Sequence, residues 1–326
     1  MNRLFISVSP HFHSKTTTRS IMLDVIIALM PTTIAGLIIY DTVKTLAVLA
    51  TGVGFAVISE YLFNKIAKKP QTVGDLSAVV TGLLLALTVH SNMPLWQVAV
   101  GSVFAIVIAK GVFGGIGQNF ANPAITGRLL MAVSFGSMAN AAFPTVDTVS
   151  KATPLAVLEN SRTVFENGTY ILKNWKGVVT GETDLMSLFL GIRGGAIGES
   201  CTIALIIGCL YLLANKIITW HTPVAYIGTV FVLSWIITGD FNMALAYTLA
   251  GGLFIGAIFM ATDYATTPYR PWGKAIFGIG AGIITVMIRF YGNLPEGVSF
   301  AILVMNLLTP YIDKWTAKKP FGGEVK

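Results

Sequence analysis

The chain has 326 residues, of which 54% are hydrophobic and only 11% are charged, and its mean hydropathy is +0.72. A single water-surrounded core cannot bury so many apolar side chains, whereas lipid accepts them directly, so the composition excludes a water-soluble globular protein. The net charge of +7 is typical of basic cytoplasmic loops of membrane proteins and does not indicate a nucleic-acid partner.

Ten apolar runs are long enough, allowing for tilt, to cross about 30 Å of hydrocarbon. They lie at 21–40, 45–63, 73–90, 95–117, 123–138, 185–214, 221–238, 243–262, 274–291 and 297–313. The sequence therefore predicts an all-α membrane protein with about ten transmembrane helices. The fourth run ends in GGIGQNFANP and the sixth contains GIRGGAIGES. Both predict broken helices, whose irregular backbone persists at membrane depth only where protein or a ligand covers it.

The chain is expected to form one membrane domain over 1–326, with polar segments at 1–20, 139–184 and 314–326. Lysine and arginine accumulate on the cytoplasmic side of a membrane. A cytoplasmic N-terminus places fifteen of the 22 lysines and arginines on that side. Both termini are therefore expected in the cytoplasm, and the segment 139–184 outside it.

Ten helices can divide into two halves of five, and an odd number per half makes the halves cross the membrane in opposite directions. Aligning 94–115 with 271–292 pairs five identical residues, among them Pro94 with Pro271 and Gly101 with Gly278. In segments so rich in glycine and isoleucine, five identities also arise by chance. The inverted five-plus-five repeat is therefore a hypothesis.

The stretch DTVSKATPL, residues 147–155, lies in the predicted outer loop. Thr153 is a favourable helix cap and Pro154 is the preferred first residue of a helix. Proline also favours an extended conformation at Thr153, which displays the threonine hydroxyl. From these residues alone, an ordinary helix cap is the simplest interpretation.

The same stretch resembles a flavin-attachment motif. In Asp-x-x-Ser-x-Ala-Thr, the acceptor motif of the ApbE-type flavin transferase, FMN is joined through its phosphate to the threonine hydroxyl. The matching residues are Asp147, Ser150, Ala152 and Thr153. Lys151 stands where a glycine is common. A phosphodiester suits this place, because a helix N-terminus offers unpaired N–H groups and the positive end of the helix dipole.

Four further blocks, taken in order, resemble the family that holds the D subunit of the Rnf electron-transport complex and the B subunit of the sodium-pumping NADH:quinone reductase. The blocks are SPHFHSKTTTRSIMLDVIIALMPTTIAG, GDLSAVVTGLLLALTV, KGVFGGIGQNFANPAITGR and GGAIGES. The resemblance covers essentially the whole chain. The short N-terminal segment is more similar to the Rnf members, because the quinone-reductase members usually carry a longer extension.

The resemblance implies a flavin-carrying electron-transfer subunit of a ferredoxin:NAD oxidoreductase complex that couples electron transfer to Na⁺ or H⁺ movement. Such a subunit is not catalytic alone. The implied partners are Rnf subunits A, B, C, E and G, the ApbE-type flavin transferase and membrane lipid, in a bacterial or archaeal inner membrane. The family also resembles urea-channel-like folds. A solute channel or transporter without a redox cofactor is therefore the alternative function.

Two glycine-rich breaks are candidates for cofactor contact. At the outer end of the sixth run, Arg193, Gly194, Gly198 and Glu199 could approach the FMN ring, because glycine permits close contact and arginine offsets negative charge. Helix-break packing explains this element equally well. The GGIGQNFANP segment lacks the preceding strand of a nucleotide loop, so its glycines are expected to open a helix end. It is also one place for a second, noncovalent flavin of the riboflavin type, which relatives bind.

The remaining ionisable residues do not predict further chemistry. Cys201 and Cys209 are too few for an iron–sulfur cluster, and His11 and His13 have no companion at ligand spacing, so no metal site is expected. Acidic residues near the ends of apolar runs are explained by contact with headgroups and nearby lysines. These are Asp24, Glu60 and Asp75, and Arg289 is similar on the outer side.

Overall fold

The computed structural model describes residues 16–135, 185–191, 194–292 and 296–317, together with Leu155, Leu158 and four short strands between 143 and 171. The described helices are α1 (Thr18–Ile39), α2 (Thr42–Ile66), the 3₁₀ turn η1 (Val73–Asp75), α3 (Ser77–Leu87), α4 (Leu95–Phe104) with the π-helix η2 (Ala105–Val112), α5 (Pro123–Ser134), α8 (Leu185–Leu190), α9 (Thr202–Ala214), α10 (His221–Thr238), α11 (Phe241–Leu249), α12 (Leu253–Ile255) with the π-helix η5 (Gly256–Met260), α13 (Pro271–Tyr291) and α14 (Val298–Trp315). Two antiparallel pairs join β1 (Phe143–Pro144) to β2 (Ser150–Lys151) and β3 (Val164–Glu166) to β4 (Thr169–Ile171).

The predicted all-α membrane fold is confirmed, and each predicted apolar run contains a helix. In the described part of the chain, five helices are long and apolar enough to cross a membrane, or six if the bent pair α11 and α12–η5 counts as one span. Two shorter apolar helices, α3 and α9, add to these. The count of ten spans and the inverted repeat stay predictions.

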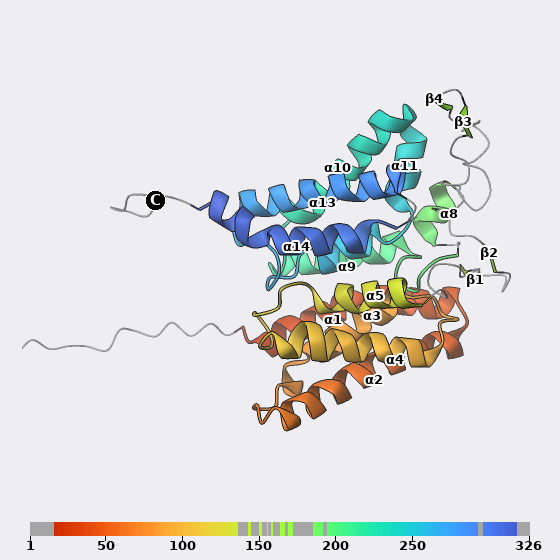
Figure 1. Cartoon of the computed structure of the whole chain (residues 1–326). Coiled ribbons are helices and arrows are strands. Elements are labelled where there is room, and N and C mark those ends of the chain that lie inside the picture. The colour runs from red at the N-terminus through yellow and green to blue at the C-terminus, as the bar shows by residue number, and fades with distance from the viewer. Residues whose placement is uncertain are drawn as a thin grey trace, which may run out of the picture.

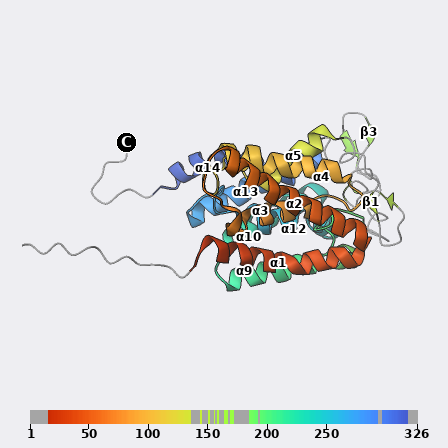
Figure 2. The same cartoon turned by 90° about the horizontal axis from the view of Figure 1, so that it is seen from below.

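The helices lie side by side in one bundle, as Figures 1 and 2 show from two directions. The start of α1 and the end of α14 lie at one end of the bundle, which we call the terminal end. The four strands lie at the opposite end, which we call the strand end. Two helix pairs, α10 with α13 and α2 with α3, pack closely, and α1 packs against α9. Both described ends of the chain thus share one side of the bundle.

Local sequence explains where several helices begin. The carboxylate of Asp41 accepts hydrogen bonds from the backbone N–H groups of Val43 and Lys44 and caps α2. Asp240 caps α11 in the same way through Asn242. Proline occupies the first turn of α5 and α13, where its missing N–H costs nothing.

Glycines let α2 and α3 approach until their backbones touch. A Cβ at Gly82 would lie 2.5 Å from the carbonyl oxygen of Gly52, and a Cβ at Gly52 would lie 2.8 Å from the Cβ of Ala86. Lipid is as apolar as the helices themselves, so close van der Waals packing rather than water exclusion holds such a pair together. The high glycine content of the chain therefore has a packing role here.

The predicted break at GIRGGAIGES is confirmed in its described part. Residues 194–201 are not helical and separate α8 from α9. The backbone N–H of Gly198 donates to the carbonyl oxygen of Leu87 over 2.7 Å, and that of Ile197 donates to Val89 over 3.0 Å. These bonds satisfy irregular backbone that lipid could not. They also tie this segment to the end of α3.

A second break, at Gly251 and Gly252, lies inside the run 243–262, for which the sequence predicts one uninterrupted helix. The chain bends by 64° between α11 and α12–η5. Gly251 has a φ of +72°, which residues with a Cβ rarely adopt. A Cβ at Gly252 would lie 2.6 Å from Glu199 Oε1. The two glycines thus permit the bend and make room for a buried carboxylate.

Gly52→Leu is expected to destabilise the protein by at least about 1–3 kcal/mol, because the new side chain meets the backbone and side chains of α3. Gly54→Leu on the same helix is the matched control, since no described atom lies within 4 Å of a Cβ placed there. The check is thermal unfolding of both purified variants in one detergent. Equal losses of Tm would contradict the packing role of Gly52.

Candidate functional site

Most of the residues predicted to attach FMN cannot be placed. Asp147, Ala152, Thr153 and Arg193 lie outside the described residues. Ser150 belongs to β2, where it pairs with Pro144 of β1 at the strand end.

Leu155 and Leu158 follow Thr153 by two and five residues, and both are buried. The Cδ2 atom of Leu155 lies 3.3 Å from the position that a Cβ would take at Gly251. The Tyr247 hydroxyl donates to the carbonyl oxygen of Leu158 over 3.4 Å. Leu155 therefore packs on the break between α11 and α12, and Leu158 contacts α11.

Charged side chains gather beside this break in a group that we call the arginine–glutamate cluster, made of Arg128, Glu199, Arg289 and Glu296. The Nη2 atom of Arg128 lies 3.3 Å from Glu199 Oε1 and also forms an ion pair with Glu296. Its Nη1 atom donates to the Ser299 hydroxyl over 3.2 Å. Arg128 on α5 thus joins the 194–201 segment to the start of α14.

Arg289 enters the same group from α13. Its Nη2 atom lies 3.0 Å from the Cβ position of Gly251, and Glu296 Oε1 lies 3.6 Å from that position. The side chain of Glu296 is 29% exposed, whereas those of Arg128 and Glu199 are 8% and 5% exposed. Glu296 is therefore the member through which solvent reaches the cluster.

The cluster is formally neutral, because two guanidinium groups face two carboxylates. Burial of Glu296 opposes its ionisation, but the positive charge of the neighbouring Arg128 guanidinium holds the pKa of the Glu296 carboxyl below its usual value. Buried guanidinium groups can stabilise an additional negative charge placed nearby, because the surrounding dielectric screens weakly.

Three of the predicted contact residues, Gly194, Gly198 and Glu199, lie in the described part of the chain. Glu199 is committed to Arg128. A Cβ at Gly198 would lie 2.8 Å from the Cβ of Leu87, so this glycine lets the 194–201 segment lie against the end of α3. Gly194 is buried at the start of that segment. Contact of these residues with a flavin stays a prediction.

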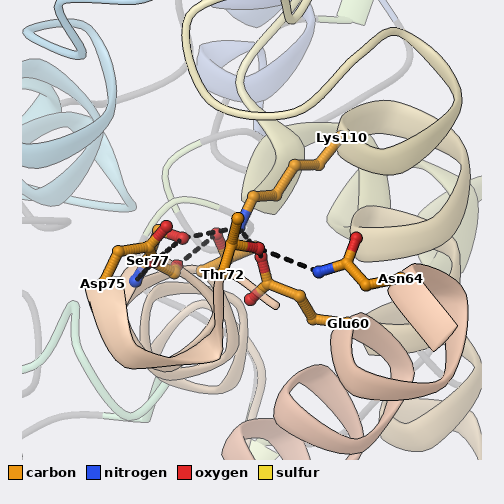
Figure 3. A network of polar contacts seen from close by, with 7 residues as sticks. Glu60, Asn64, Thr72, Asp75, Ser77 and Lys110 are labelled. Atoms are coloured by element: carbon orange, nitrogen blue, oxygen red, sulfur yellow. Dashed lines mark hydrogen bonds and ion pairs between the residues drawn. The ribbon is translucent and has the colours of Figure 1, made fainter. Parts of the chain in front are cut away.

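A second polar group lies in the terminal half of the bundle, and we call it the lysine–glutamate network (Figure 3). Lys110 of η2 forms an ion pair with Glu60 of α2 at 2.6 Å and donates to the Ser77 hydroxyl. Thr72 donates to Glu60 over 2.7 Å and accepts from Asn64 over 2.9 Å. The expected contact of Glu60 with a lysine is confirmed, but the pair is buried rather than at headgroups.

Two cavities adjoin this network. One of about 310 Å³ is lined by Glu60, Lys110 and the glycines at 114 and 115. The other, of about 90 Å³, is lined by Asn119, Asn122 and Asp263, among others. The Oδ1 atom of Asn119 has no hydrogen-bond partner among the described residues. An unsatisfied amide beside a cavity suits a polar ligand edge.

The GGIGQNFANP segment behaves as its sequence predicts. Three of its glycines have positive φ values, at positions 114, 115 and 117, and open the end of η2. Asn122 caps α5 through the N–H of Ala124, and its amide donates to the carbonyl oxygen of Met260 over 3.3 Å. This polar contact joins α5 to η5.

Sequence reasoning missed the arginine–glutamate cluster. Arg128 is one of the fifteen lysines and arginines that a cytoplasmic N-terminus places on the cytoplasmic side, yet it lies buried in α5 and forms an ion pair with Glu296. The available signal was Pro123, which marks the start of a helix that continues past Arg128. An arginine inside an apolar helix calls for a buried acidic partner.

Comparison with known proteins assigns the chain to a family. Residues 5–322 match the family described as NQR2, RnfD, RnfE. The chain is 42% identical to the D subunit of the Na(+)-translocating ferredoxin:NAD(+) oxidoreductase complex of Acetobacterium woodii, over 98% of this chain and 95% of the relative. It is 41% identical to the D subunit of the proton-translocating ferredoxin:NAD(+) oxidoreductase complex of Clostridium ljungdahlii, over 98% and 97%.

A more distant relative gives the same assignment. The D subunit of the ion-translocating oxidoreductase complex of Actinobacillus succinogenes is 31% identical over 97% of both chains. The similarity thus runs through the whole membrane domain rather than through one motif. This multi-pass membrane chain therefore belongs to the NQR2, RnfD, RnfE family.

Proposed function

We propose that the chain is the D subunit of an ion-translocating ferredoxin:NAD oxidoreductase complex and carries electrons on FMN attached to Thr153. Full-length relatives with the corresponding names support the complex. The motif formed by Asp147, Ser150, Ala152 and Thr153 supports the attachment. The partners would be subunits A, B, C, E and G, and the ApbE-type flavin transferase would mature the chain.

One observation carries this proposal beyond the motif: Leu155 is buried against the α11–α12 break, beside Arg289 and Glu296. A group attached two residues earlier would lie near these charges. Bound FMN supplies one- and two-electron transfer, and its phosphate and reduced ring are anionic. Arg289 and Arg128 would offset that charge, while Glu296 keeps the cluster in contact with solvent.

The proposal places the acceptor motif on the outer side of a bacterial or archaeal inner membrane, with both termini in the cytoplasm. The strand end, which holds β2 with Ser150, lies opposite the terminal end of the bundle. That relative arrangement supports the sidedness inferred from lysine and arginine. The proposal covers coupling to either Na⁺ or H⁺, because relatives named for each ion are 42% and 41% identical to this chain.

We further propose a second, noncovalent flavin of the riboflavin type in the cavity lined by Asn119, Asn122 and Asp263. The unsatisfied Asn119 amide suits the polar edge of a flavin or the hydroxyls of its side chain. A cavity of about 90 Å³ is small for a three-ring system, so binding would require the lining loops to move apart.

The alternative is a solute channel or transporter without a redox cofactor. The broken helices favour it as much as they favour an electron carrier. The family membership and the Thr153 motif favour the electron carrier. Covalent flavin on the purified chain separates the two functions directly.

Wild-type chain produced with the flavin transferase is expected to give a fluorescent band on a denaturing gel and a peptide heavier by FMN less one water. Thr153→Ala is expected to lose both signals, because the phosphoester needs the hydroxyl. Thr148→Ala, in the same segment, is the control and should keep them. An unmodified wild-type peptide from the assembled complex would remove the covalent site and favour the transporter.

Asn119→Ala is expected to lower the amount of flavin released by denaturation without changing the covalent band, because it removes the amide that faces the cavity. Asn92→Ala is the control, since Asn92 is exposed near the start of α4 and accepts from Lys44. The measurement is flavin fluorescence in the supernatant after acid precipitation. Equal release from wild type and Asn119→Ala would reject this cavity as the site.

A further inference from the structure

The break between α11 and α12 exposes the end of a half-helix inside the bundle. The last α-helical hydrogen bond of α11 runs from the N–H of Ala250 to the carbonyl oxygen of Ala246 over 2.8 Å. The carbonyl groups after Ala246 therefore point out of the helix end toward Gly251. They carry the negative end of the α11 dipole.

A carbonyl-lined half-helix end at membrane depth is a cation site in many transporters. Unwound carbonyl groups and the C-terminal ends of broken helices coordinate the coupling ion, because they combine partial negative charges with an open position. A break of 64° with two glycines has this geometry. Left unfilled in a low-dielectric bundle, such carbonyls would attract a mobile cation.

In this protein the side chain of Arg289 occupies that position. Its Nη1 atom donates to the carbonyl oxygen of Tyr247 over 2.6 Å, and its Nη2 atom donates to that of Ala250 over 3.2 Å. Arg289 comes from α13 and is 3% exposed. A guanidinium remains charged even when buried, so the site holds a permanent positive charge.

We propose that Arg289 is a built-in cation that fills the carbonyl site at the α11–α12 break and keeps mobile cations out of it. The break is then a closed structural element, and the ion that the complex translocates does not bind there. The proposal rests on the contacts of Arg289 and not on the flavin. It excludes the broken helix end at Gly251 and Gly252 from the ion path.

The surroundings explain how a small cation could replace the side chain if it were removed. Glu296 Oε1 and Arg289 Nη2 lie 3.6 and 3.0 Å from the same point at Gly251. Since the Glu296 side chain is 29% exposed, it connects this point to solvent. Removing the guanidinium would leave carbonyl oxygens and a nearby carboxylate, which are ligands for a monovalent cation.

The test is thermal unfolding of the purified full-length chain and of Arg289→Ala, with guanidinium chloride added at millimolar concentration and choline chloride keeping the ionic strength constant. Arg289→Ala is expected to have a lower Tm than wild type in choline alone. Guanidinium at about ten times its dissociation constant should raise the Tm of the variant by about 2 °C or more, because it binds only the folded state. Wild type should not respond.

Two controls make the result specific. Urea has the shape of guanidinium without its charge, so it should not rescue Arg289→Ala. Arg270→Ala removes another arginine that donates to a helix-end carbonyl, that of Thr316, but at the terminal end of the bundle. Water replaces the guanidinium there, and no selective response is expected. Equal rescue of both variants, or rescue by urea, would overturn the proposal.

If Arg289→Ala does not fold, two other variants test whether the break needs a positive charge at position 289. Arg289→Lys keeps a positive charge, whereas Arg289→Gln keeps hydrogen-bond donors without charge. The proposal expects the Tm of the lysine variant to be closer to wild type. A glutamine variant as stable as wild type would show that the break needs only donors, and would overturn it. So would a folded Arg289→Ala that no cation stabilises.

Discussion

In hydrocarbon, every backbone amide and carbonyl needs a partner within the protein, and this constraint organises the chain. Regular helices meet it internally. Where a helix ends inside the bundle, a residue distant in the sequence supplies the missing hydrogen bond. Arg289 donates to carbonyl oxygens at the end of α11. The N–H of Gly198 donates to Leu87, and the amide of Asn122 donates to Met260. Lipid competes with apolar contact between helices but cannot replace these bonds. The breaks therefore add hydrogen bonds between distant segments to the packing of the helices.

The same constraint applies to charge, and the two ionic groups meet it by internal neutrality. Lys110 pairs with Glu60 in the terminal half, and Arg128 pairs with Glu199 and Glu296 toward the strand end. A buried pair contributes little net stability, but removal of one partner leaves the other charge uncompensated. Such pairs are conspicuous candidates for function. Arg128 and Arg289 lie beside the proposed flavin anchor. They can stabilise the negative charge of a reduced flavin without a counterion from water.

Much of the fold followed from hydropathy, and much of the site did not. The run 221–238 coincides with α10 because polar residues bound it on both sides. The breaks at GIRGGAIGES and GGIGQNFANP were readable because glycines there interrupt the apolar pattern with polar residues. Gly251 and Gly252 sit among apolar residues, where close helix packing was the simpler interpretation. The Arg128–Glu296 ion pair joins residues that are 168 positions apart, and periodicity cannot report which helices meet.

A membrane bundle with broken helices inside it must keep those breaks from binding mobile ions. The glycine break that brings the backbone beside Leu155 also exposes the carbonyls of Tyr247 and Ala250, so the feature that suits a flavin site would otherwise attract cations. The Arg289 side chain in this carbonyl site prevents a mobile cation from binding there. Its guanidinium donates hydrogen bonds to the carbonyl oxygens and places a positive charge near the proposed anionic FMN. The fold is compatible with relatives named for Na⁺ and for protons at nearly equal identity. If Arg289 fills the break, the selectivity between Na⁺ and protons is set elsewhere in the complex. The break then contributes only to the proposed flavin site.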